Sequence, residues 1–419
     1  MEQRKLYKTI ESIIREAPNF DSNEKFLTHV ISKIIEMENV EILGGRLWKL
    51  NKNKDAYVLV SQIGDVAHID KNFKLKIKDY PIFRQFKHKR AYLAKETDEY
   101  LLKKGIYHYS ATGVGERYKI KVKGSLFPDY YYLYQYLIAL NGKEQDDDFL
   151  NTLNIISVTL SSVLRAKKLE TKAKEEFEEL EKASEIQKSI LPEHELKFGN
   201  YEIFGISIPD KIVGGDFFDY LIIDEDYKIS VVIADAASKG ISAAAQALYV
   251  SGALKMGVFY DVSITSLIKR INDLVYNTFP NERFVTLFYC ELYKDRKGLC
   301  LYANAGHNSP LHLNYKLNKI EPLLPTGPVL GPSSNQNYRT DSINLEEKDI
   351  LLLYTDGITE AANENFEFYT EERLKSQLEK YKDLSAKEIC ELIVEDVQKF
   401  NAGGKYCDDK TLVVIKRIN

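Results

Sequence analysis

Residues 229–240 read ISVVIADAASKG and place Asp235 directly after a run of apolar residues. Residues 350–360, ILLLYTDGITE, repeat this arrangement with Asp356. Short apolar runs that end in turn residues are typical of buried strands. Carboxylates at the mouths of buried strands are held rigidly, and several that converge repel one another unless a cation neutralises them. The two segments therefore predict a sheet-containing domain with an acidic, cation-binding edge.

The residue types indicate which cation this edge would bind. No His or Cys residues stand at zinc spacing, and the four cysteines (Cys290, Cys300, Cys390 and Cys407) are scattered. Carboxylate oxygens alone favour a hard ion, Mg²⁺ or Mn²⁺. Further acids stand at Asp216, after two glycines, and at Asp408 and Asp409. A single Asp-Gly pair is more often a turn, so the interpretation depends on the order of the segments.

Residues 193–419 show the texture of an α+β domain. Apolar runs bounded by turn residues predict strands at 229–234, 284–291, 299–304, 350–354 and 411–416. Helical periodicity predicts helices at 241–257, 263–278, 371–381 and 385–401.

Seven segments in a fixed order carry a family resemblance. They are EIQKSILP at 185–192, VGGDFFD at 213–219, ADAASKG at 234–240, FVTLF at 284–288, NAGHN at 304–308, LYTDGITE at 353–360 and DDKT at 408–411. Over residues 184–419 the chain resembles the SpoIIE-type serine/threonine phosphatases, a branch of the metal-dependent type 2C protein phosphatases. The resemblance implies an α-β-β-α sandwich with two Mn²⁺ or Mg²⁺ ions at one edge.

The resemblance also implies roles for individual residues. Asp235 would bridge both ions, and the carbonyl of Ala236 would join one of them. Asp356 and Asp408 would hold the other ion, and Asp216 would act directly or through water. Two cations suit phosphate-ester hydrolysis by an activated water, so no covalent phosphoenzyme is required.

The second motif departs from the family's Asp-x-Ser-Gly-Lys-Gly. Ser238 replaces a glycine that could need positive φ, and Ala237 removes a hydroxyl, which puts the rate in doubt. Lys239 could contact the substrate phosphate or face solvent. His307 could contact phosphate as a general acid or hold its loop by hydrogen bonds, so we leave it outside the catalytic set.

Residues 1–165 are expected to form a mixed α/β unit, with helical spacing at 26–35 and strands at 46–50, 57–63 and 130–140. This part resembles a GAF-type sensor domain, and a PAS-type sensor is the alternative. A tyrosine cluster on the last strand is interpreted as core and dimer surface rather than a cofactor box; it comprises Tyr130, Tyr131, Tyr132, Tyr134 and Tyr136.

A long helix is predicted at 149–191, stopped by Pro192. An a/d-like seam runs through Ala166, Leu169, Ala173, Leu180, Ala183, Gln187 and Ile190, with Glu176 interrupting it. We interpret the helix as a weak coiled coil that joins a homodimer and carries the sensor's signal; a solvated linker is the alternative.

Composition limits the remaining possibilities. The 419 residues suggest two or three domains, and the segments described above reduce this to two. The 62 acidic against 58 basic residues give a net charge of −4, which argues against nucleic acid. The first residues lack a secretory pattern, and the longest apolar run, 130–140, is too short for a membrane span. We therefore expect a cytoplasmic protein.

The combined interpretation is a sensor-regulated phosphatase for phosphoserine or phosphothreonine on a partner protein. By family resemblance, that substrate would be a STAS-type anti-sigma-factor antagonist in partner-switching signalling. The alternative is a weakly active or inactive scaffold that binds the phosphoprotein and reports the state of the sensor.

Overall fold

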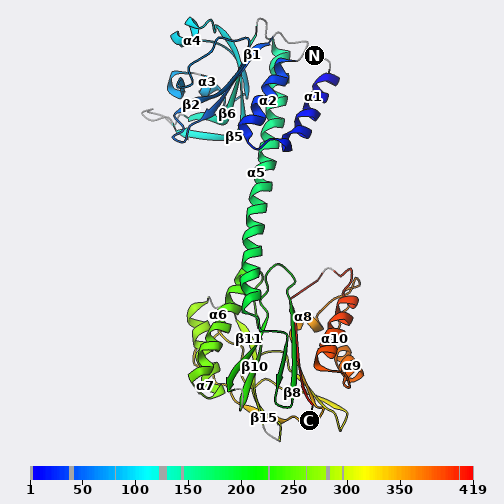
Figure 1. Cartoon of the computed structure of the whole chain (residues 1–419). Helices are drawn as coiled ribbons and strands as arrows, with labels where there is room; N and C mark the ends of the chain where they lie inside the picture. Colours follow the sequence, from blue (N-terminus) through cyan, green and yellow to red (C-terminus); the bar gives the residue numbers. More distant parts are fainter. Residues whose placement is uncertain are drawn as a thin grey trace. The chain divides into compact units, whose positions relative to one another are not determined.

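The computed structural model describes residues 3–36, 42–80, 82–121, 130–142, 146–224, 227–260, 262–279, 284–294, 297–404 and 406–418. The chain divides into two compact units, Met1–Glu175 and Glu176–Asn419 (Figure 1). The helix α5, Asp147–Ile190, contributes residues to both units.

The N-terminal unit is built on a six-stranded antiparallel sheet with the order β3-β2-β1-β6-β5-β4. Its strands are β1 (Ile42–Leu50), β2 (Ala56–Gly64), β3 (Lys74–Lys76), β4 (Ala91–Lys95), β5 (His108–Lys121) and β6 (Tyr130–Gly142). Its shorter helices are α1 (Gln3–Glu16), α2 (Asn23–Ile35), α3 (Ile82–Gln85) and α4 (Glu99–Lys103). The strands predicted at 46–50, 57–63 and 130–140 are confirmed, as is the helix around 26–35.

Each face of this sheet has its own core. On one face, α2 and the first half of α5 pack their apolar stripes on the sheet; this core includes Leu27, Ile31, Leu140, Ile156 and Leu160. The other face is rich in aromatic residues from the sheet, α3 and the loops, among them Trp48, Tyr57, Phe83, Phe86 and Tyr134. Tyr134 and Tyr136 are buried in these cores, which agrees with the core interpretation of the tyrosine cluster.

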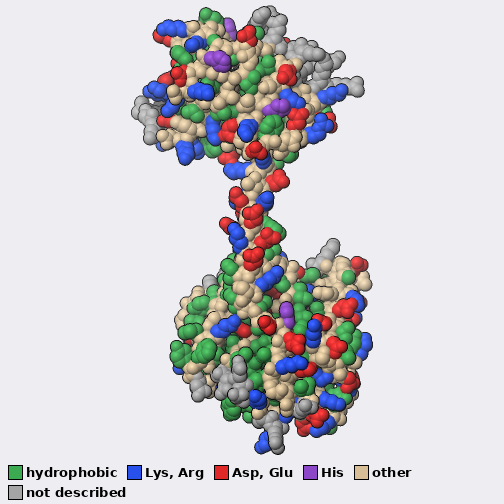
Figure 2. All heavy atoms as spheres, viewed as in Figure 1, with side chains coloured by type: hydrophobic (Ala, Val, Ile, Leu, Met, Phe, Trp, Pro, Cys, Tyr) green, Lys and Arg blue, Asp and Glu red, His purple; other side chains and the backbone are tan. Residues whose placement is uncertain are grey.

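The helix α5 changes character along its length. It begins beside Asp146, whose carboxylate accepts a hydrogen bond from the amide of Phe149, and it ends at Ile190, two residues before Pro192. From residue 165 to residue 179 its side chains are exposed, apart from the half-buried Lys167, and acidic and basic groups mix along it (Figure 2). Leu169 of the expected seam is 60% exposed.

Of the described helices, α5 alone is long and apolar enough, by length and composition, to cross a membrane. The first half of α5 was not recognised as apolar from the sequence, because Ser, Thr and Asn interrupt its apolar residues. Core helices of globular proteins share this length and composition, and α5 contributes Leu153, Ile156, Leu160 and Leu164 to the core of the N-terminal unit.

The C-terminal unit contains two antiparallel sheets. The five-stranded sheet has the order β15-β12-β11-β10-β9, formed by β9 (Phe217–Asp224), β10 (Lys228–Ala236), β11 (Val285–Tyr293), β12 (Leu299–Ala305) and β15 (Asp341–Asn344). The six-stranded sheet has the order β14-β13-β16-β17-β8-β7, formed by β7 (Glu195–Phe198), β8 (Tyr201–Ile208), β13 (Leu311–Asn314), β14 (Lys319–Pro322), β16 (Ile350–Tyr354) and β17 (Lys410–Arg417).

The layers of this unit follow from three cores. Helices α6 (Ile241–Gly257) and α7 (Ile264–Thr278) pack on the five-stranded sheet. Helices α9 (Glu371–Tyr381) and α10 (Ala386–Phe400) pack on the six-stranded sheet. A third core between the sheets includes Phe218, Phe288 and Leu351. The expected α-β-β-α order is present, and the strands and helices predicted for this half all occur.

Candidate metal centre

Five aspartates approach one another where the two sheets of the C-terminal unit meet. Asp216 directly precedes β9, and Asp235 is the penultimate residue of β10; both strands belong to the five-stranded sheet. Asp356 begins the short helix α8 (Asp356–Thr359) after β16, and Asp408 and Asp409 precede β17 in the six-stranded sheet. The structure thus brings together the four aspartates that the sequence singled out as metal ligands, with Ala236 buried beside Asp235.

The carboxylates affect one another's ionisation. Burial, followed by the charge of Asp235, raises the pKa of Asp216 well above its usual range. Burial, followed by the charge of Asp356, raises the pKa of Asp235 to about 7. The pKa of Asp356 is also raised, by burial first and then by Glu360 and Asp408. The cluster carries more negative charge than its surroundings stabilise.

Thr355 joins the two sheets at this point. Its hydroxyl donates to Oδ2 of Asp216 at 2.7 Å and accepts from the backbone N–H of Thr411 at 3.0 Å. The residue is fully buried. Thr355 was not singled out from the sequence, although its place directly before Asp356 at the end of a buried strand was a usable signal.

Asp409 holds the glycine loop that leads into Asp216. Its carboxylate accepts from the backbone N–H of Gly215 at 2.6 Å and from that of Asp210 at 2.8 Å. A Cβ on Gly214 would lie 2.6 Å from the same carboxylate, so the close approach requires glycine. Asp409 therefore acts as a loop anchor, a role the sequence analysis did not assign.

Lys239 lies at the mouth of the site. Its Nζ is 2.9 Å from Oδ2 of Asp408, and this carboxylate raises the pKa of the lysine. The lysine therefore neutralises one acid of the cluster instead of simply facing solvent.

Ser238, at the departure from the family motif, does not adopt a positive φ, whereas Gly240 has φ 70°. The backbone at position 238 thus does not require glycine for its φ angle.

His307 is buried, and its Nδ1 lies 2.8 Å from the hydroxyl of Thr286. Its backbone N–H donates to the side chain of Asn304 at 2.8 Å. Burial lowers the pKa of His307 to about 4, so the ring is neutral near neutral pH. These contacts favour the loop-holding role of His307 over contact with a substrate phosphate.

Gln187, near the end of α5, contacts the glycine loop directly. Its Nε2 donates to the carbonyl of Gly214 at 2.7 Å, and its Oε1 accepts from the N–H of Gly214 at 3.2 Å. One turn further, Lys255 of α6 donates to the carbonyl of Ile190 at 3.1 Å and pairs with Asp219 at 3.0 Å. Gln187, expected on a coiled-coil seam, is instead buried against the loop that carries Asp216.

The donor set suits a hard cation because it consists of oxygen atoms, and its mutual repulsion would be relieved by positive charge. Within the described part of the chain, however, no group of three or more His, Cys, Asp and Glu side chains is arranged to hold a metal ion. Ligation by Asp216, Asp235, Ala236, Asp356 and Asp408 therefore stays a prediction.

Comparison with known proteins identifies the domain that carries this site. The family described as Stage II sporulation protein E (SpoIIE) matches residues 225–418. The C-terminal half is a SpoIIE-type serine phosphatase domain. The phosphatase domain is similar to phosphoserine phosphatase RsbU of Bacillus subtilis strain 168, with 28% identity over 57% of this chain and 70% of RsbU.

Further similarities cover the same half of the chain. Phosphoserine phosphatase RsbP of Bacillus subtilis strain 168 is 25% identical over 57% of this chain and 57% of RsbP. Among solved structures, the SiaA-PP2C domain of Pseudomonas aeruginosa matches 59% of this chain and 99% of that domain, with a TM-score of 0.51 and 19% identity. The last comparison shows that the phosphatase domain has the PP2C fold. The N-terminal unit is not identified by these matches.

Proposed function

We propose that this chain is a sensor-regulated, metal-dependent phosphatase for phosphoserine and phosphothreonine in a partner protein. The observation that carries the proposal is the meeting of Asp216, Asp235 and Asp356 at the junction of the two sheets, with Asp235 and Asp356 inside the stretch that matches the SpoIIE family. Two relatives of this domain, RsbU and RsbP, are phosphoserine phosphatases, which supports the reaction type.

In this proposal, Asp216, Asp235, the carbonyl of Ala236, Asp356 and Asp408 would hold two Mn²⁺ or Mg²⁺ ions. Such ions supply activation of the attacking water and neutralisation of the charge that develops on the phosphate. Thr355 keeps the Asp216 carboxylate oriented, and Asp409 fixes the loop before it. Lys239 provides a positive charge at the entrance, where it pairs with Asp408.

The substrate class is proposed from the family. A phosphorylated STAS-type anti-sigma-factor antagonist would present a phosphoserine or phosphothreonine to the acidic edge. Hydrolysis would release inorganic phosphate and return the free hydroxyl to the partner, which then changes its binding partner in a partner-switching pathway.

The N-terminal unit is proposed to be a GAF-like sensor in a cytoplasmic homodimer. Its six-stranded antiparallel sheet, with α2 and α5 packed on one face, supports this assignment. The contacts of Gln187 with Gly214 support a route by which α5 influences the loop before Asp216.

The test is metal-dependent hydrolysis by the full chain. Wild type, Asp235→Asn and Asp356→Asn are assayed with Mn²⁺ on a generic phosphate ester and on a phosphoserine peptide. Asp65→Asn is the control, because Asp65 is an exposed aspartate in the other unit. We expect Mn²⁺-dependent turnover in wild type and in the control, and its loss in both site variants.

Two results would count against the enzyme. Turnover that persists in Asp235→Asn and Asp356→Asn would mean that these carboxylates are not ligands. Absence of any metal-dependent turnover, together with binding of the phosphoprotein, would favour the scaffold alternative.

A further inference from the structure

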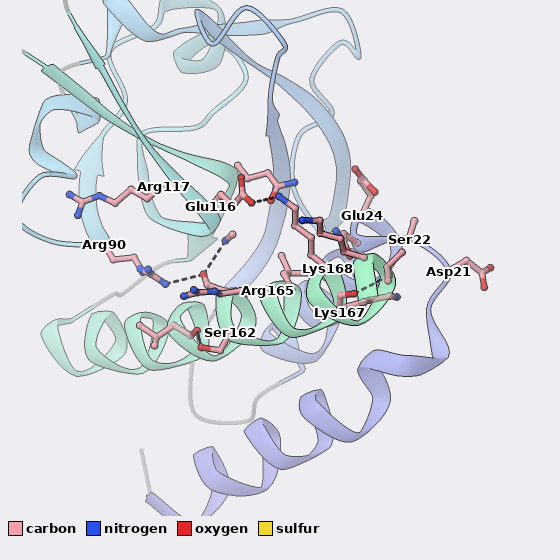
Figure 3. A pocket seen from close by; sticks show the side chains of 18 of the residues that line it. Asp21, Ser22, Glu24, Arg90, Glu116, Arg117, Ser162, Arg165, Lys167 and Lys168 are labelled. Carbon is pink, nitrogen blue, oxygen red and sulfur yellow. Dashed lines mark hydrogen bonds and ion pairs between the residues drawn. The ribbon is translucent and has the colours of Figure 1, made fainter. Parts of the chain in front are cut away.

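The N-terminal unit contains an open groove with a volume of about 1170 Å³ (Figure 3). Its walls are the segment 21–24, the middle of β5 around Gly115 and the stretch of α5 from Val158 to Glu175. Six basic side chains line it: Arg90, Arg117, Arg165, Lys167, Lys168 and Lys172. All lining residues belong to the N-terminal unit, so the groove is independent of the phosphatase site.

Most acidic residues of the groove are already engaged with lysines. Glu116 pairs with Lys168, Glu24 pairs with Lys49 at 2.6 Å, and Asp21 lies 3.6 Å from Lys25. Glu175 stands exposed at the far end. Among the described residues, no carboxylate is paired with Arg90, Arg117 or Arg165, so the positive charge of these three arginines is not neutralised.

Arg90 is held in place by neutral groups. Its Nη1 donates to the carbonyl of Ser157 at 3.1 Å and to the hydroxyl of Ser161 at 2.9 Å. The same hydroxyl accepts from the N–H of Gly115 at 3.0 Å, which ties β5 to α5. The guanidinium carbon of Arg90 lies 5.0 Å from the centre of the Tyr134 ring. The remaining N–H groups of this ordered guanidinium are available to a ligand.

Arg117 stands on the β5 wall and is oriented in a similar way. Its Nη2 donates to the carbonyls of Phe86 at 2.6 Å and Lys87 at 3.1 Å. Its guanidinium carbon lies 4.7 Å from the centre of the Tyr132 ring. Both arginines are thus fixed by carbonyl, hydroxyl and aromatic contacts, none of which cancels their charge.

Arg165 brings a third guanidinium from α5. It lies one helical turn after Ser161, and long side chains on a helix point back toward its N-terminus. Arg165 is therefore directed back along α5 toward Arg90, as Figure 3 shows. It is exposed, so its long side chain can adjust to a bound group.

The positive charge continues beyond the groove. A neighbouring hollow of about 700 Å³ shares Arg90 and Arg117 with it. This hollow adds the exposed Lys87, His88 and Lys89, against the single acid Asp147. The two hollows therefore form one basic trough that continues on both sides of Arg90 and Arg117.

We propose that this trough binds a small molecule that carries at least two phosphate groups, with Arg90, Arg117 and Arg165 as the phosphate-contacting residues. Arginine is suited to this task because its planar guanidinium can donate two parallel hydrogen bonds to one phosphate. Inorganic pyrophosphate and a nucleoside diphosphate share this chemistry. A ligand held by Arg165 and Arg90 would contact both α5 and the loop before β4.

The test is calorimetric titration of the full chain with inorganic pyrophosphate and, separately, with ADP, both without divalent metal. Omitting the metal leaves the phosphatase site acidic, so it does not attract the probe. Arg165→Gln is the main variant, because Arg165 makes no described contact whose loss would impair folding. Lys174→Gln removes the same charge from an exposed position of α5 that does not line the groove.

We expect pyrophosphate to bind wild type and Lys174→Gln with similar affinity, and to bind Arg165→Gln about 10- to 100-fold more weakly. Arg165→Lys should fall between them, because it keeps the charge and loses the paired hydrogen bonds. Tighter binding of ADP than of pyrophosphate would assign the ligand to the nucleotides, and equal binding to diphosphates in general.

Two outcomes would overturn the proposal. One is the absence of binding of either probe to wild type at millimolar concentration. The other is equal weakening by Arg165→Gln and Lys174→Gln, which would mean that the probe responds to net charge and not to the trough.

Discussion

Replacement of Gln187 by alanine tests whether the end of α5 controls the glycine loop that leads into Asp216. The side chain is 9% exposed and makes two hydrogen bonds to one residue, Gly214, at 2.7 and 3.2 Å. The variant leaves a buried N–H and a buried C=O of Gly214 without these partners. Each unsatisfied group costs about 1–3 kcal/mol, so we expect a total of about 2–4 kcal/mol after partial relaxation.

This cost falls on the loop that is two residues from Asp216, so the ordered loop becomes less populated. A penalty of about 2–4 kcal/mol corresponds to a decrease of about 30- to 900-fold in the ratio of ordered to disordered loop. We expect a comparable decrease in kcat/KM, measured with saturating Mn²⁺ on a phosphate ester. Thermal unfolding, followed in parallel, separates this local effect from loss of the fold.

Lys188→Ala is the matched control, because the neighbouring side chain is exposed on the same helical turn. It should retain wild-type activity. Gln187→Glu keeps the acceptor for the Gly214 amide but places a carboxylate against the carbonyl, so it should also lose activity. Activity of Gln187→Ala within twofold of wild type, with an unchanged melting temperature, would refute the reasoning.

Three further predictions concern the surroundings of the site. Thr355→Val removes the hydrogen bond to Asp216 and should lower the free energy of unfolding, measured in urea, by about 1–3 kcal/mol. Thr355→Ser keeps the hydroxyl and should retain most of this stability. Equal stability of the two variants would contradict the prediction. A Cβ at Gly357 would lie 1.9 Å from the carbonyl oxygen of Asp409, so Gly357→Ala should reduce both thermal stability and phosphatase activity; an unchanged melting temperature would show that the loop adapts. Burial lowers the pKa of His307 from 6.5 to about 4, so its contribution to stability is complete above pH 6.5 and is lost as the pH falls toward 4. This loss should reach about 3 kcal/mol by urea unfolding across that range, and a His307→Gln variant with the same pH slope would argue against it.

The regular elements of the phosphatase domain could be predicted because periodicity and turn residues act locally. The segment 350–354 was predicted as a strand and is one, and Pro192 stops α5 as expected. The acidic edge could be predicted as well, because its aspartates stand at the ends of buried strands in the sequence. These are Asp216, Asp235, Asp356 and Asp408.

The remaining features of the site depend on contacts between distant segments. Asp409 and Asp408 are neighbours of the same type, and only the fold shows that Asp409 accepts amide hydrogens from the glycine loop while Asp408 pairs with Lys239. Gln187 matched a heptad position, but in the fold its buried side chain forms hydrogen bonds with the backbone of Gly214. The basic trough was not predicted, because it combines arginines from β5, α5 and the loop before β4 that have no sequence pattern in common.

The exposed part of α5 has a consequence for hydrogen exchange. Residues 165–179 are helical but contribute almost no buried surface, so their order depends on intrinsic helix propensity and on nearby charge pairs. Helical segments of this length are only marginally stable in water without tertiary packing. Amide hydrogens in this stretch should therefore exchange faster, and with greater sensitivity to salt, than those of Leu160 or Gln187, which lie in packed regions of the same helix.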